Sequence, residues 1–112
     1  FCRIIAYSVA HSPLVKTAFF AEDPNWGRIL AAVGKADVPE LDIHQVSISI
    51  GSYKIIENGQ IRDDYNEEKA AKEMKKDEVS ILIRVGRGTG NSTVWTCDYS
   101  YDYIKINAEY RT

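Results

Sequence analysis

The chain has 112 residues, of which 45% are hydrophobic and 27% charged, and its formal net charge is −2. This is the size of about one domain, and the composition is ordinary for a soluble globular one. A nearly neutral chain without a concentrated basic face is a poor match for nucleic acid. No stretch approaches the ~20 apolar residues that span a bilayer, so we expect no membrane partner either.

The first twenty residues predict a helix and then a short strand. In residues 3–11, four side chains lie near one helical face: Ile4, Ile5, Ser8 and Val9. Pro13 follows at once, and because the residue before a proline is pushed out of the helical region, we expect the helix to end there. Residues 14–20 (LVKTAFF) alternate in the manner of a strand.

Residues 23–34 carry the clearest helix pattern in the chain. Asp23 is a good N-cap, and Pro24 stands where the first helical residue tolerates proline. Gly34 is expected to supply a left-handed stop. Four apolar side chains recur with helical spacing and form one stripe: Trp26, Ile29, Leu30 and Val33.

The second half alternates between strand patterns and one polar helix. Asn58-Gly59 predicts a tight hairpin turn, and residues 66–76 predict a helix with a narrow apolar stripe. Strands are expected at residues 46–50, 78–85, 92–100 and 101–107. Two or three helices on a mostly antiparallel sheet of four or five strands is an α+β fold, here one domain over residues 1–112.

No complete catalytic or metal-binding motif is visible. The glycine-rich run at residues 86–91 (GRGTGN) lacks a following helix, so it is interpreted as a hairpin loop rather than a phosphate cradle. His11 and His44 have no partner at ligand spacing, so no metal is expected. Cys2 and Cys97 are interpreted as reduced thiols.

Two stretches remain as candidate sites. Asp23, Asn25 and Arg28 crowd the start of one helix, where they either cap it or bind an anion. Asn107 stands near the end of the last strand, where asparagine is often a turn former. Thr112 brings a hydroxyl and a terminal carboxylate, which is charged at pH 7 because its pKa is about 3.3–3.7.

Two long runs resemble one known family. Residues 12–36 (SPLVKTAFFAEDPNWGRILAAVGKA) and residues 86–112 (GRGTGNSTVWTCDYSYDYIKINAEYRT) are similar to the C-terminal part of the bifunctional glutamate N-acetyltransferase / ornithine acetyltransferase family of arginine biosynthesis. The middle of the chain, residues 38–77, carries little of the resemblance. Two specific runs in the same order make a chance match improbable.

The resemblance implies an enzyme made of several chains. In this family a precursor cuts itself before a threonine, which then heads the β chain and becomes the nucleophile. It takes the acetyl group from N-acetylornithine and passes it to glutamate through an acyl-enzyme, and some members also accept acetyl-CoA. The resemblance implies no other cofactor, a heterotetramer of α and β chains, and a cytoplasmic location.

The motif that contains the nucleophile is absent from this chain, as is the α chain with its oxyanion hole. Residue 1 is Phe rather than Met, which indicates a processed product or a fragment that is inactive alone. By the resemblance, Asn107 and Thr112 correspond to residues that touch substrate, while Asp23, Asn25 and Arg28 support the site from nearby. A self-cleaving amidohydrolase and a non-catalytic amino-acid-binding or assembly module are the alternatives.

Overall fold

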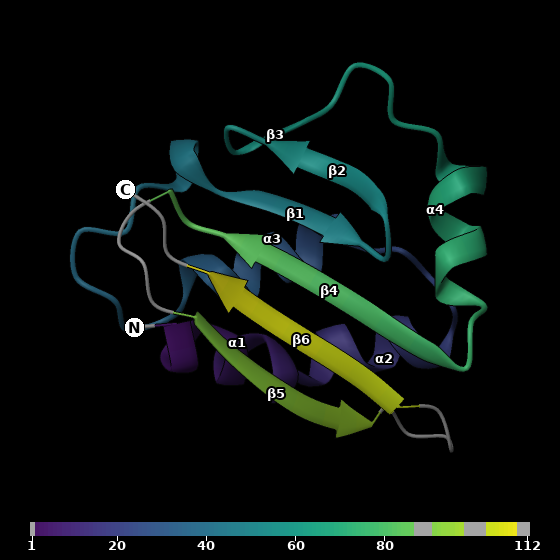
Figure 1. Cartoon of the computed structure of the whole chain (residues 1–112), viewed down its shortest axis with the longest axis horizontal. Helices are drawn as coiled ribbons and strands as arrows, with labels where there is room; N and C mark the ends of the chain where they lie inside the picture. Colours follow the sequence, from purple (N-terminus) through teal and green to yellow (C-terminus); the bar gives the residue numbers. More distant parts are fainter. Residues whose placement is uncertain (1, 87–90, 98–102, 110–112) are drawn as a thin grey trace.

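In the computed structural model, one layer of helices packs on one sheet (Figure 1). The structure describes residues 2–86 and 92–94 in full, and the backbone of residues 91, 95–97 and 103–109. The helices are α1 (Cys2–Ala10), α2 (Pro13–Phe20), α3 (Trp26–Gly34), a 3-10 turn (Ile43–Gln45) and α4 (Glu67–Met74). The strands are β1 (Ser47–Ile50), β2 (Tyr53–Glu57), β3 (Gln60–Ile61), β4 (Glu78–Arg84), β5 (Asn91–Cys97) and β6 (Tyr103–Glu109).

The strands form one sheet in the order β3-β2-β1-β4-β6-β5. All pairings are antiparallel except β4 with β6, which run parallel. The predicted α+β class with a mostly antiparallel sheet is therefore confirmed. The described residues contain six strands rather than four or five, because the hairpin adds β3, which has only two residues.

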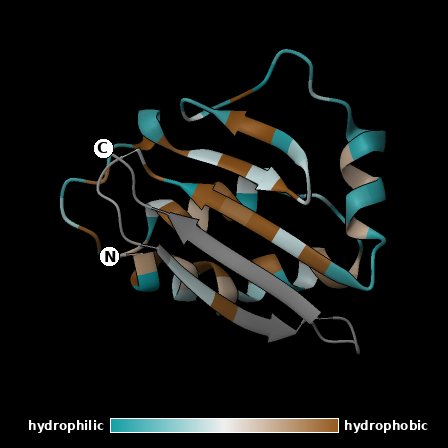
Figure 2. Cartoon of the chain, viewed as in Figure 1, coloured by the Kyte–Doolittle hydropathy of each residue, from teal (hydrophilic) through white to brown (hydrophobic). Residues whose placement is uncertain are grey.

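The two faces of the sheet differ sharply in burial. Helices α1, α2 and α3 lie behind the sheet in Figure 1, while α4 lies at its side. On β4, the side chains of Val79, Ile81 and Ile83 are buried beneath the helices, whereas Ser80 and Leu82 point away and are half-buried. Figure 2 shows β4 as mostly brown with a pale stretch toward its beginning, so the two faces differ more in burial than in hydropathy. Each fully buried aliphatic side chain contributes about 1.5–3 kcal/mol to folding.

Residues 14–20 are helical, so the predicted short strand is wrong. The side chain of Ser12 caps α2 by accepting a hydrogen bond from the backbone N–H of Val15, and Pro13 occupies the first turn, where proline is favoured. Val15, Ala18 and Phe19 then share one buried face with helical spacing. The Ser-Pro pair that ends α1 therefore also begins α2, and this outweighs the weak alternation.

Helix α3 is confirmed, but both of its predicted ends shift. Asn25 rather than Asp23 is the N-cap. Gly34 is the last helical residue and not a left-handed stop, because Lys35 closes the helix with an ordinary negative φ of −84°. The expected stripe is largely confirmed: Ile29 and Val33 are buried in the core, and the other two side chains pack against it.

Two turns decide how the strands connect. The Asn58-Gly59 hairpin between β2 and β3 is confirmed, with φ values of 53° and 75°. Strands β4 and β5, which flank the glycine-rich run, are not neighbours in the sheet, because β6 lies between them. Residues 87–90 of that run lie outside the described residues. Among the helices described, none is long and apolar enough to cross a membrane.

Candidate functional site

Asn107, the first residue predicted to touch substrate, lies on an interior strand. Strand β6 pairs with β4 on one side and β5 on the other, and the register places Asn107 opposite Leu82 and Thr93. Ala108 and Glu109 continue both pairings, so the backbone of Asn107 lies within the sheet rather than beyond its end. Because Asn107 is paired on both sides, it does not form a turn, which was the alternative interpretation of this asparagine. Thr112 lies outside the described residues, and its proximity to Asn107 stays a prediction.

The second candidate cluster is held together by its own hydrogen bonds. The side-chain oxygen of Asn25 accepts a hydrogen bond from the backbone N–H of Arg28 at 3.1 Å. The Asn25 amide nitrogen donates to the Asp23 carboxylate, also at 3.1 Å. The Arg28 guanidinium donates to the backbone carbonyl of Leu14 at 2.9 Å and so ties α3 to α2. These bonds favour a structural role for the three residues over direct ligand binding.

The negative charge of Asp23 also extends toward the segment before α4. Burial is the largest effect that raises the pKa of the Tyr65 hydroxyl, and the nearby charges of Glu67 and Asp23 add to it. The Tyr53 hydroxyl closes the same region by accepting a hydrogen bond from the backbone N–H of Asn66 at 2.7 Å.

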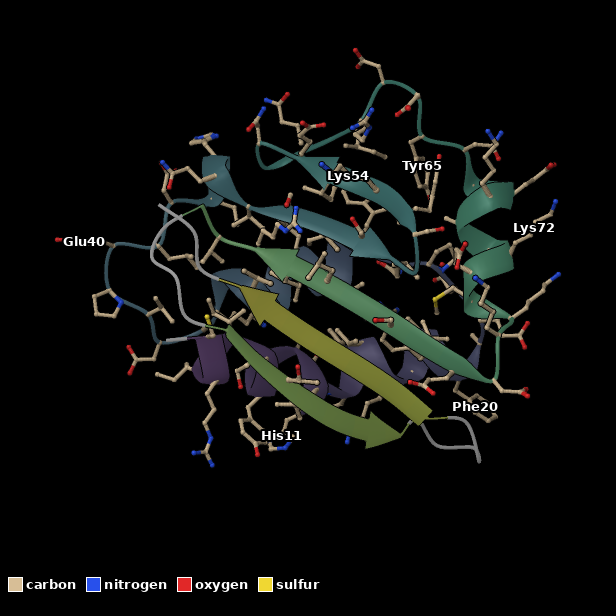
Figure 3. All side chains as sticks on the ribbon, in the orientation of Figure 1. His11, Phe20, Glu40, Lys54, Tyr65 and Lys72 are labelled. Carbon is tan, nitrogen blue, oxygen red and sulfur yellow. The ribbon has the colours of Figure 1, made fainter. Side chains whose placement is uncertain are left out.

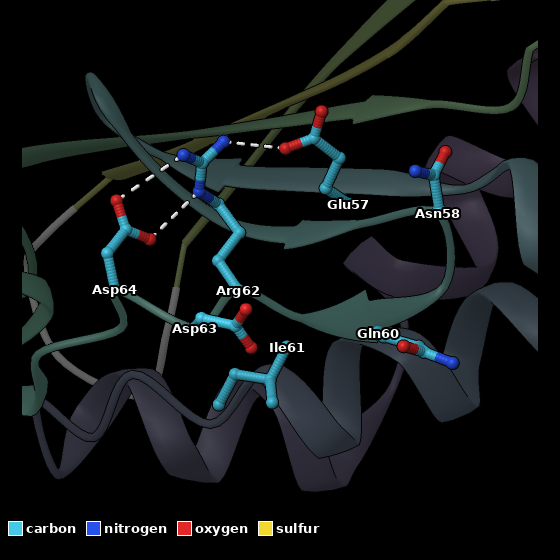
Figure 4. A pocket seen from close by; sticks show the side chains of 7 residues that line it. All are labelled: Glu57, Asn58, Gln60, Ile61, Arg62, Asp63 and Asp64. Carbon is cyan, nitrogen blue, oxygen red and sulfur yellow. Dashed lines mark hydrogen bonds and ion pairs between the residues drawn. The ribbon is translucent and has the colours of Figure 1, made fainter.

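An open groove of about 440 Å³ follows the β2–β3 hairpin, and sequence reasoning missed it. Figure 4 shows its lining, in which the Arg62 guanidinium reaches two carboxylates. Arg62 pairs with Glu57 at 2.6 Å and with Asp64 at 2.9 Å. A run of acidic residues around one arginine after a hairpin turn was the available signal.

The ion pairs in this groove leave little capacity for an anionic ligand. The hydrogen bond from Arg62 is the main cause that lowers the pKa of Asp64, and the same bond raises the pKa of Arg62. Because two carboxylates already neutralise the guanidinium, the groove does not resemble a receptor for a carboxylate or phosphate. We interpret the ion pairs of Arg62 as structural, because they connect β2 to the segment that leads into α4.

Neither histidine is part of a metal-binding cluster. The His11 ring packs against Tyr7 with centroids 5.1 Å apart. The Asp42 carboxylate caps the 3-10 turn by accepting a hydrogen bond from the backbone N–H of His44. Within the part of the chain that the structure describes, no three His, Cys, Asp or Glu side chains gather around a position for a metal ion.

Comparison with protein families gives one match over the whole chain. Residues 1–112 match the model of the ArgJ family. The chain is 50% identical over 111 residues to the arginine biosynthesis bifunctional protein ArgJ of Pseudomonas fluorescens, and 54% identical to that of Psychrobacter arcticus. Both alignments cover 99% of this chain but only 27% of the relative. The chain therefore spans about a quarter of the length of these curated relatives.

A solved structure supports the same relationship. The crystal structure of the arginine biosynthesis bifunctional protein from Bacillus halodurans superposes with a TM-score of 0.80 at 32% sequence identity. The match covers 88% of this chain and 46% of the other. Together these comparisons confirm the resemblance predicted from the two sequence runs. That the chain is the C-terminal domain of a β chain stays a prediction.

Proposed function

The chain belongs to the ArgJ family, and on that premise we propose that it is one part of an acyltransferase. The whole enzyme would move an acetyl group from N-acetylornithine to glutamate, and acetyl-CoA would be a second acetyl donor. The proposed reaction needs no bound cofactor. Residues 1–112 would form the C-terminal domain of the β chain in a cytoplasmic heterotetramer. The observation that carries the proposal is the family match along the full chain, shared with relatives named for arginine biosynthesis.

The proposed chemistry needs a nucleophile from outside this chain. A threonine hydroxyl on the preceding segment attacks the acetyl carbonyl of N-acetylornithine, and ornithine leaves with its amine protonated. The amine of glutamate then attacks the acyl-threonine ester, which yields N-acetylglutamate and frees the hydroxyl. Each half-reaction transfers one acetyl group and needs no redox partner.

In this proposal, Asn107 and Thr112 hold the amino-acid skeleton while the threonine reacts. An asparagine side chain donates two N–H bonds and accepts through its oxygen, which suits a ligand carrying both a carboxylate and an ammonium group. The hydroxyl of Thr112 would add an acceptor for the ammonium group. Asp23, Asn25 and Arg28 would act by fixing the start of α3, in keeping with their mutual hydrogen bonds.

Asn107→Ala in the full-length precursor tests the assignment. A hydrogen bond to a charged group is worth about 1.5–3 kcal/mol, so kcat/KM for N-acetylornithine should fall roughly 10- to 100-fold. Self-cleavage should continue, because Asn107 is proposed to bind the substrate and has no part in the cleavage step. Deletion of Thr112 should act in the same direction. Gln60→Ala is the matched control, since it removes an exposed amide on the distant hairpin.

Unaltered kinetics in both the Asn107 and Thr112 variants would remove these residues from the substrate site. The same assay separates the proposed transferase from a hydrolase. An acyltransferase releases ornithine in proportion to added glutamate, whereas acetate release independent of glutamate would indicate hydrolysis. A non-catalytic binding module would show neither reaction when joined to the rest of the ArgJ polypeptide.

A further inference from the structure

The sheet has one face that no described helix covers. Helices α1–α3 pack on the other face, as Figure 3 shows with the strands in front of them. Because Ile48, Ile81 and Val94 are buried on the helical side, their chain neighbours Ser49, Leu82 and Thr93 point to the open side. We name this surface, made of the outward-pointing residues of β1, β2, β4 and β5, the open face.

The open face has a row of register partners across its middle, which passes one irregularity in the pairing of β1 with β2, between Ile48 and Ser49. Lys54 of β2 lies opposite Ser49 of β1, and Ser49 lies opposite Leu82 of β4. The register then runs through Asn107 of β6 to Thr93 of β5. Figure 3 labels Lys54 over β2, at one end of this row. The row thus places the backbone of Asn107 between two described residues of the open face, Leu82 and Thr93.

We propose that the open face is the surface on which the preceding part of the ArgJ polypeptide, the part that contributes the nucleophile, docks. The inference rests on the proposed function, because it starts from a reacting group on another segment that must meet Asn107. Strand β6 is paired along both edges, so no polypeptide reaches its middle from the side. Helix α1 packs against β5 and β6 from behind. The open face is the remaining approach.

The size of the side chains and the length of the relatives agree with this docking. Ser47, Ser49 and Ser80 are small and half-buried, so a second layer can approach the strands closely. Leu82 stands between them as a half-buried apolar contact. Nearly three quarters of the length of the curated relatives lies outside this chain, which provides ample polypeptide to cover the face.

Thiol labelling in the full-length protein tests the proposal. This chain replaces the matching quarter of the Psychrobacter arcticus protein, which is 54% identical. One variant carries Thr93→Cys on the open face, and the other carries Leu14→Cys on the outer surface of α2. Both positions are exposed in the chain itself, Leu14 at 58%. A maleimide probe reacts with each variant, and peptide mass spectrometry assigns the labelled cysteine apart from Cys2 and Cys97.

The expected result is that Thr93→Cys reacts at least tenfold more slowly than Leu14→Cys in the folded protein, while both react equally fast in urea. Equal rates in the folded protein would overturn the proposal. Protection of Leu14→Cys with rapid labelling of Thr93→Cys would overturn it too, and would move the docking surface to the helices. If Thr93→Cys fails to fold, Ser49→Cys in the same row repeats the measurement.

The labelling result is independent of catalysis, so the two proposals fail separately. Protection of the open face combined with unchanged kinetics in Asn107→Ala would preserve the docking and remove the substrate role of Asn107. Lost activity in Asn107→Ala combined with a fully reactive Thr93→Cys would preserve the substrate role. It would show that the nucleophile reaches Asn107 by another route.

Discussion

The two faces of the sheet differ in how much hydrophobic burial their residues contribute to the fold of this chain. On the helical face, Ile48, Ile81 and Ile83 are completely buried, and their apolar area holds the sheet to the helices. On the open face, Ser49 and Ser80 are small and polar, so they add little hydrophobic burial within the chain itself. The comparison teaches that stability and the proposed function are carried by opposite faces of the same strands.

The largest expected effect is on the helical face. Ile81→Ala removes a fully buried side chain from β4, and should lower the free energy of unfolding by about 2–5 kcal/mol. Ser80→Ala, the next residue on the same strand, is the matched control. It should lower the free energy of unfolding by less than Ile81→Ala does, because it removes one oxygen atom from a half-buried position and leaves no large cavity. Urea denaturation of the chain followed by circular dichroism measures both. Similar losses in the two variants would break the contrast between the faces.

A smaller effect is expected at the start of α3. Asn25→Ala removes the N-cap, which should cost about 0.5–2 kcal/mol of stability. Asn66→Ala removes the equivalent cap of α4, whose side-chain oxygen accepts from the backbone N–H of Lys69 at 3.1 Å. If Asn25 is structural, the two variants lose similar stability and neither changes KM in the full-length enzyme.

A different pattern would return Asn25 to the candidate site. A KM for N-acetylornithine that rises severalfold in Asn25→Ala, but not in Asn66→Ala, would identify a contact with substrate beyond capping. Steady-state kinetics on the two variants, each with its measured unfolding free energy, separates the two roles.

Local sequence patterns predicted the elements that depend on local chemistry. The apolar stripe of α3 and the Asn58-Gly59 turn each follow from residues close together in the chain. The wrong prediction of a strand at residues 14–20 also concerns local chemistry. The alternation of apolar residues there is weak, and the Ser12 cap together with Pro13 makes the segment a helix. The prediction that Gly34 stops the helix in a left-handed conformation was wrong, because the helix ends at Lys35 with a negative φ.

The arrangement around Asn107 was beyond such patterns. The sequence shows β4, β5 and β6 in order, but β6 inserts between the other two, and no local residue signals this insertion. The neighbours of Asn107 therefore come from pairings far apart in the chain. The groove at Arg62 was missed for a related reason, because its lining depends on how the hairpin and the following segment fold together.

The smallest expected effect concerns the exposed ion pairs of Arg62. The pKa of Asp64 is lowered from its ordinary value of 3.8, chiefly by the hydrogen bond from Arg62. A depressed pKa in the folded state stabilises the protein above the unfolded value, and the contribution is lost as pH falls through the folded value. Asp64→Asn should therefore unfold at slightly lower urea than the wild type at pH 7. The difference should shrink as the pH falls below 3.8 and vanish once Asp64 is protonated in the folded state as well.

Asp63→Asn is the control for the prediction at Asp64, since Asp63 lines the same groove but lies outside the two ion pairs of Arg62. Its urea midpoint should track the wild type across the pH range. High salt should shrink the effect of Asp64→Asn, because both partners are exposed and exposed charges are screened. A pH-independent loss in Asp64→Asn would instead show that Asp64 acts through the geometry of the loop. The groove would then contribute to stability through its geometry, as the helical face of the sheet does, although it is open to solvent.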